Sequence, residues 1–168
     1  MGQIATKFSL LKNIDEKKAF LKAIPFSAIS GGLTDEYYQT LTDFDFISLK
    51  ISDDTFRVEA LIRDYDLIHD PEILKNLDPE ETLNPQQLKT LKFIQRTLEL
   101  SSHILNEDPT QLVGQLWGRL QGFNYPDIEK LLEDAKDSTP KKVRLRPLTA
   151  SLTTPDSCLI KTLITIVL

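Results

Sequence analysis

Cysteine and glycine are scarce in this chain of 168 residues, which contains one cysteine and six glycines. A single cysteine, Cys158, excludes an internal disulfide and fits a protein of a reducing compartment. No stretch approaches the roughly 20 consecutive apolar residues that a membrane-spanning helix needs. The pair Gly31-Gly32 is not followed by the Lys-Ser/Thr of a phosphate-binding loop, so the sequence encodes no such nucleotide-binding motif.

Positive charge and targeting signals are also in short supply. The chain has 25 acidic and 20 basic residues and a net charge of −5, whereas a general nucleic-acid binder needs a basic face. The first 11 residues lack the features of a signal peptide, although Gly2 and Thr6 match the loose pattern for N-myristoylation. His69 and His103 have no Cys or His neighbours at metal-ligand spacing. We therefore expect a cytoplasmic protein with no metal or other cofactor, which binds neither nucleic acid nor membrane.

A series of helix starts is what the chain does have. Asp or Asn precedes proline four times, at Asp70-Pro71, Asp78-Pro79, Asn84-Pro85 and Asp108-Pro109. The short polar side chain caps a helix, and proline takes the first helical position, where an N–H is not needed. No strand pattern separates these starts. They predict an all-α protein, either a bundle or a superhelical array of short helices.

The spacing of apolar residues predicts where the other helices lie. One continuous helix is expected from Thr34 to Ile51, because its apolar residues recur at intervals of 4, 3, 3 and 4. An earlier helix is expected from Asn13 until Pro25 stops it. The remaining helices are expected at about 58–68, 71–77, 85–106, 109–120 and 127–136.

Composition divides the chain into four parts. Residues 1–33 are expected to form an N-terminal helical remnant, and residues 34–137 a helical domain. Residues 138–157 are rich in Ser, Thr and Pro, which predicts an extended linker or an arm that follows the surface. Residues 158–168 are apolar and β-branched, which predicts an unpaired strand from the start of a following domain.

Two acidic segments, 41–47 and 62–68, repeat at a distance of 21 residues. Asp43 and Asp45 flank an aromatic residue in the first segment, and Asp64 and Asp66 do so in the second. Residues two apart on a helix point in nearly opposite directions, so a carboxylate site would need one acid from each helix to meet. We prefer the interpretation that a core aromatic residue is flanked by solvated acids, and a hydrolase site near Asp43 and Asp66 is the alternative.

Glycine recurs at every fourth position in one of the expected helices, at Gly114, Gly118 and Gly122. A glycine inside a helix costs about 1 kcal/mol relative to alanine, so three of them need a physical reason. Close approach of a neighbouring helix would supply one. We therefore expect close helix packing at these three positions, with Ser101 and Ser102 opposite.

Two further features are candidates for contact with a partner protein. Trp117 is expected either in the core or as an anchor at a domain interface. Lys141, Lys142, Arg144 and Arg146 form a small basic cluster in the linker. This cluster is either solvated or in contact with an acidic surface.

Several segments, in this order, resemble one known family over about residues 35–163. Residues 41–51 (LTDFDFISLKI) and 60–67 (ALIRDYDL) look like the start of the helical arm of apoptotic protease-activating-factor-like signal-transduction ATPases. Residues 111–120 (QLVGQLWGRL) resemble the final helices of that arm. Residues 144–155 (RLRPLTASLTTP) are similar to the segment that enters the first strand of the following WD-repeat propeller. The chain departs from the family at both ends of this region. Residues 1–33 contain neither a P-loop nor a complete winged helix. The Gly-His that normally follows this strand in WD repeats is absent after Leu163.

The resemblance implies a role without catalysis. In that family the arm lies between a nucleotide-binding module and the propeller, and it offers no catalytic residue to match here. We therefore expect a helical scaffold or spacer of a multidomain signalling protein, which contacts a neighbouring propeller or nucleotide-binding module of the same chain or of another chain. The alternative is a stand-alone adaptor that binds a partner through Trp117 or the basic cluster. The weaker alternative is the carboxylate-dependent hydrolase.

Overall fold

The computed structural model describes residues 3–11, 13–77, 82–138 and 151–156 of the chain. No strand occurs within these ranges, so the predicted all-α fold class is confirmed for them. The elements are α1 (Gln3–Leu10), α2 (Ile14–Ser30), α3 (Thr34–Thr42), α4 (Phe44–Ser52), α5 (Arg57–Asp66), the 3-10 helix η1 (Leu67–His69), α6 (Pro71–Leu74), α7 (Pro85–Glu107), the 3-10 helix η3 (Pro109–Gln111), α8 (Leu112–Leu120) and α9 (Pro126–Asp137).

Three of the four predicted Asp/Asn-Pro starts begin helices as expected. Asn84 starts α7 with a complete capping box, in which its side chain accepts from the Gln87 N–H at 2.9 Å and the Gln87 side chain accepts from the Asn84 N–H at 2.9 Å. Asp70 and Asp108 cap α6 and η3 through their side chains. The fourth start, at residues 78–79, lies outside the described residues. Local capping chemistry therefore sets where these helices begin.

The helix expected to run continuously from Thr34 is in fact two helices, α3 and α4. The chain is extended at Asp43, with φ −82° and ψ 120°, and the Asp43 side chain accepts a hydrogen bond from the Phe46 N–H at 2.9 Å. Asp43 is thus an N-cap, and N-caps have non-helical backbone angles. The predicted apolar positions are nevertheless all buried, because the two helices face the same core.

The prediction that Pro25 ends its helix is wrong. Helix α2 continues through Pro25 to Ser30. Proline removes one backbone hydrogen bond without forcing the chain to leave the helix, and Ala28 and Ile29 beyond it are buried in the core. The helix ends at the glycine pair, where Gly32 has φ 75°, a conformation that glycine adopts without strain.

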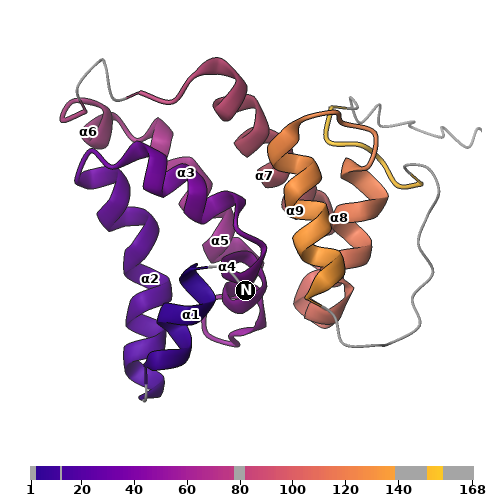
Figure 1. The fold of residues 1–168 in the computed structure, drawn as a ribbon, viewed down its shortest axis with the longest axis horizontal. Coiled ribbons are helices and arrows are strands. Elements are labelled where there is room, and N and C mark those ends of the chain that lie inside the picture. The colour runs from indigo at the N-terminus through magenta and orange to yellow at the C-terminus, as the bar shows by residue number, and fades with distance from the viewer. Residues whose placement is uncertain (1–2, 12, 78–81, 139–150, 157–168) are drawn as a thin grey trace, which may run out of the picture.

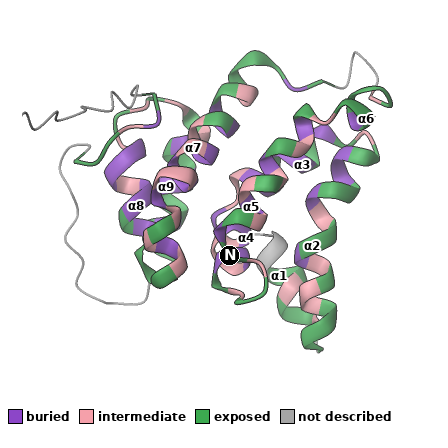
Figure 2. Ribbon diagram, turned by 180° about the vertical axis from the view of Figure 1, so that it is seen from behind, coloured by how far each residue is buried: buried purple, intermediate pink, exposed green. Residues whose placement is uncertain are grey.

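The helices form an array that runs from α2 at one side of the molecule to α8 and α9 at the other (Figure 1). Helix α2 packs on α3, α5 packs on α4 and α7, α7 packs on α8, and α9 contacts α3, α4 and α8. Buried and exposed residues alternate along most of these helices, as in amphipathic helices (Figure 2). A single buried cluster extends from Leu21 in α2 to Ala135 in α9, so α2 shares its core with the helices of 34–137.

Two tyrosines connect α3 and α5 reciprocally. The hydroxyl of Tyr37 in α3 donates to the backbone carbonyl of Asp64 at 2.6 Å, and the hydroxyl of Tyr65 in α5 donates to the carbonyl of Leu41 at 2.7 Å. Both carbonyls belong to the last turn of a helix, where backbone acceptors lack partners within the helix. Each helix thus supplies a hydrogen bond to the end of the other.

Candidate functional site

A non-helical segment near the end of the chain, residues 151–156, lies on helix α8 (Figure 1). The N–H groups of Ser151 and Leu152 donate to the carbonyl of Gly118 at 3.1 Å and 3.0 Å. This carbonyl is in the last turn of α8, where carbonyl groups have no N–H partner within the helix. The segment therefore attaches to α8 through backbone groups that the helix end leaves available.

Arg119 fastens the same segment from the neighbouring position. Its side chain is buried, with 6% relative exposure, and its Nη1 donates to the carbonyl of Thr153 at 2.7 Å. Its Nε donates to the Ser101 hydroxyl at 3.0 Å, and its Nη2 donates to the Gln115 side-chain oxygen at 3.3 Å and the Leu100 carbonyl at 3.4 Å. One guanidinium thus joins α7, α8 and segment 151–156.

All the groups that accept hydrogen bonds from Arg119 are uncharged. Burial lowers the pKa of Arg119 from its usual value, but guanidinium stays charged in proteins. A buried charge is costly unless hydrogen bonds satisfy it, and removing its partners is correspondingly destabilising. Arg119 and Gly118 therefore hold the backbone of this segment, and we call the arrangement the segment clamp.

Gly118 makes a close contact of the kind expected, but its neighbour is not a helix. A Cβ at Gly118 would lie 2.8 Å from Leu152 Cδ1 and 3.0 Å from Leu152 Cγ. A Cβ at Gly114 would have no atom of another part of the molecule within 4 Å. Gly122 lies after the end of α8. Gly114 therefore has open space, and at Gly118 segment 151–156 lies where a neighbouring helix was expected.

The other predicted contact residues are only partly described. Trp117 is half-buried and packs against the core cluster. The basic cluster of Lys141, Lys142, Arg144 and Arg146 lies outside the described residues, as do Cys158 and the rest of 158–168. Trp117 therefore contributes to packing at the α8 end of the array.

The acids of the repeated segments have separate structural partners. Asp43 caps α4, Asp64 pairs with Lys50, and Asp66 accepts a hydrogen bond from Gln95 Nε2 at 2.6 Å. Burial raises the pKa of Asp64 to about 6, against the effect of Lys50, and burial also raises the pKa of Asp43. Across the part of the chain that the structure describes, no three His, Cys, Asp or Glu side chains gather closely enough to hold a metal ion.

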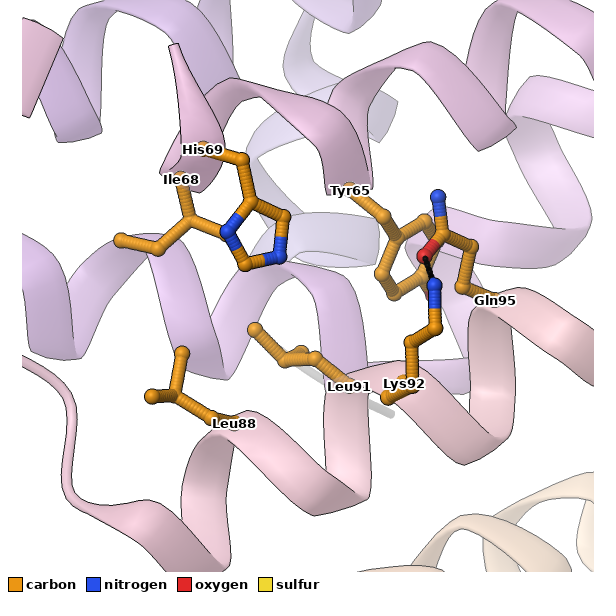
Figure 3. Close-up of a pocket in the computed structure, with 7 residues that line it drawn as sticks. All are labelled: Tyr65, Ile68, His69, Leu88, Leu91, Lys92 and Gln95. Carbon is orange, nitrogen blue, oxygen red and sulfur yellow. Dashed lines mark hydrogen bonds between the residues drawn. The ribbon is translucent and has the colours of Figure 1, made fainter. Parts of the chain in front are cut away.

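His69 lines a small pocket between η1 and α7 (Figure 3). Its volume is about 10 Å³, comparable to the space needed for one water molecule. Lys92 and Gln95 are hydrogen bonded to each other at 3.4 Å on its rim, and the other lining residues are Tyr65, Ile68, Leu88 and Leu91. His103 is exposed on α7. This pocket is too small for a substrate.

Sequence reasoning missed two of the buried charged residues, Arg119 and Lys50. The available signal for Arg119 was its spacing of four from Gln115, which puts two polar side chains on one side of a helix rich in leucine. None of the helices in the described ranges combines the length and the apolar character needed to cross a membrane. In comparisons of this chain with protein-family models, curated proteins and solved structures, no match was found.

Proposed function

We propose that this chain is a helical scaffold and spacer without catalytic activity, which holds the segment leaving it in a fixed position. The observation that carries the proposal is the segment clamp, in which Arg119 and Gly118 bind the backbone of residues 151–153. The resemblance of residues 41–51 and 60–67 to the helical arm of signal-transduction ATPases supports the same role. The partner would be a propeller or nucleotide-binding module in the cytoplasm.

A spacer must resist deformation, and hydrogen bonds between distant helices support this property. Tyr38 in α3 donates to Asp127 in α9 at 2.6 Å. Asn106 near the end of α7 donates to Glu59 in α5 at 2.6 Å, and Gln95 in the middle of α7 bonds to α5 as well. These connections join helices that are far apart in the sequence, so the array bends less easily than helices joined only by their loops.

A spacer must also control the direction in which the chain leaves it. Backbone recognition serves this purpose, because it fixes the path of the chain whatever the side chains beyond the clamp. Thr153 and Ser151 are held through main-chain groups, while the side chain of Leu152 rests against Gly118. A residue with a side chain at position 118 would push Leu152 away, which gives glycine here a purpose.

The proposal is tested by the distance between the two sides of the array. Spin labels at Lys22→Cys on α2 and Asp156→Cys after the clamp, with Cys158→Ser, report this distance by pulsed electron resonance; both labelled positions are exposed. We expect one narrow distance distribution for this protein and a broad one after Arg119→Met, which releases Thr153.

The control is Arg96→Met, since Arg96 is 35% exposed and forms a surface pair with Glu99 on α7. Exposed ion pairs contribute little to stability, so the distribution should stay narrow in this variant. A broad distribution in the labelled parent, or no broadening after Arg119→Met, would contradict the proposed spacer.

A further inference from the structure

A buried lysine joins three helices at the other side of the array. Lys50 in α4 has 2% relative exposure, and its ammonium pairs with the carboxylate of Asp64 in α5. The same ammonium donates to the backbone carbonyl of Leu21 in α2 at 3.1 Å. It also lies 5.5 Å from the ring centroids of both Phe46 and Phe56. Lys50 is therefore enclosed, and the groups around it account for two of its three N–H donors.

The carbonyl of Leu21 is available because of Pro25. In an α-helix the carbonyl of one residue accepts from the N–H four positions later, and for Leu21 that position is Pro25, inside α2. Proline has no N–H, and its ring crowds the carbonyl four residues before it. Pro25 thus removes the helical donor of the Leu21 carbonyl, and Lys50 donates in its place at a residue buried in the core.

Pairing with Asp64 does not by itself explain why a lysine is buried here. Burial lowers the pKa of Lys50 and raises that of Asp64, so for both groups the loss of water outweighs their mutual attraction. Buried ion pairs are often no more stable than apolar residues of similar size. Replacing both members of the ion pair by apolar residues would still leave the Leu21 carbonyl without the donor that Lys50 provides.

We propose that Pro25 and Lys50 form a hinge and its latch: Pro25 opens the hydrogen-bond ladder of α2, and Lys50 closes the gap from α4. The helix is thereby held together at this point by a tertiary contact in place of its own backbone. Helix α1 contacts both sides of this junction: the rings of Phe8 and Phe20 lie 6.3 Å apart between α1 and α2, and α1 also packs on α4. Release of Lys50 would free the first half of α2 to pivot relative to α4.

The test is a mutant cycle that separates the effect of losing the hydrogen bond to the Leu21 carbonyl from the effect of losing the ion pair with Asp64. Lys50→Met with Asp64→Asn removes both charges at once and leaves the Leu21 carbonyl without its donor. Adding Pro25→Ala restores a backbone N–H at position 25, which can bond to that carbonyl. We expect the charge-removing pair to speed hydrogen exchange of amides 14–24 roughly tenfold or more when Pro25 is present, and far less in the Pro25→Ala background.

Amides of residues 26–30 in the second half of α2 serve as the internal reference, and Lys22→Met, an exposed lysine in the same helix, serves as the control. Equal acceleration with Pro25 present and in the Pro25→Ala background would overturn the proposal, since the lysine would then act only through Asp64. If the Lys50→Met/Asp64→Asn variant does not fold, the proposal requires that the same variant with Pro25→Ala does fold. If neither variant folds, the proposal is overturned.

Discussion

Replacing Gly118 and Gly114 by alanine should have opposite effects on stability, although both glycines lie in α8. Alanine stabilises a helix by about 1 kcal/mol relative to glycine. At Gly114 the added Cβ has open space, so this gain should appear almost in full. At Gly118 the Cβ would lie 2.8 Å from Leu152 Cδ1, so the leucine must move.

The loss at Gly118 can be worked out from the contacts of Leu152. Its relative exposure is 37%, so it retains about two-thirds of the roughly 1.5–3 kcal/mol that full burial of a leucine contributes. The two hydrogen bonds to the Gly118 carbonyl contribute about 1 kcal/mol each. Losing a large part of the Leu152 burial and of the two hydrogen bonds costs more than the helix propensity of alanine contributes. Gly118→Ala should therefore destabilise the protein by roughly 1–2 kcal/mol.

Urea unfolding followed by the fluorescence of the single tryptophan, Trp117, measures both variants. Hydrogen exchange at residues 151–156 should accelerate in Gly118→Ala and stay unchanged in Gly114→Ala. Leu152→Ala should rescue Gly118→Ala, because the Cβ of residue 152 would be 3.6 Å from the new methyl group, an ordinary contact. Equal stabilisation by both glycine replacements, with no change in exchange at 151–156, would refute the segment clamp.

Two further predictions concern a helix start and a titrating group. Asn84→Ala should lower the free energy of unfolding by about 1 kcal/mol through loss of the capping box, whereas Gln86→Ala, at an exposed neighbouring position, should have little effect. Because the pKa of Asp64 is raised to about 6 from 3.8, the folded state binds its proton more tightly than the unfolded chain does. Stability relative to Asp64→Asn should therefore fall as pH rises from 4 to 6, at most by roughly 1.4 kcal/mol per pH unit, and urea titrations showing the reverse slope would contradict this.

The sequence predicted the helical fold class and most of the helices after residue 57, because capping and apolar spacing are local signals. The start of α7 at Asn84 is the clearest example, since both partners of its capping box lie within four residues. The break at Asp43 could not be separated from helical spacing, because the apolar positions of α3 and α4 face one core as a single helix would. Helix α1 was not predicted at all, and its apolar contacts include Phe8 against Phe20 of the next helix.

The segment clamp could not be predicted because it depends on contacts between distant positions. Arg119 and Thr153 are 34 residues apart, and Thr153 lies within the expected linker, residues 138–157. The glycine spacing marked Gly118 as unusual, but it predicted a helix as the neighbour, whereas the non-helical segment 151–156 lies there. In the same way, Pro25 was recognised as a helix breaker, while the lysine that compensates for it is 25 positions further along the chain.

The reciprocal tyrosines of α3 and α5 have a consequence for how the array can fluctuate. Each phenolic hydroxyl donates to a single carbonyl oxygen, so sliding one helix along the other by the rise of one residue, about 1.5 Å, would break both hydrogen bonds. Tyr37 and Tyr65 therefore both oppose small displacements along the helix axes. A rigid rotation of the two helices together leaves both hydrogen bonds intact. Slow motions of the protein should consequently move α3 and α5 as one block.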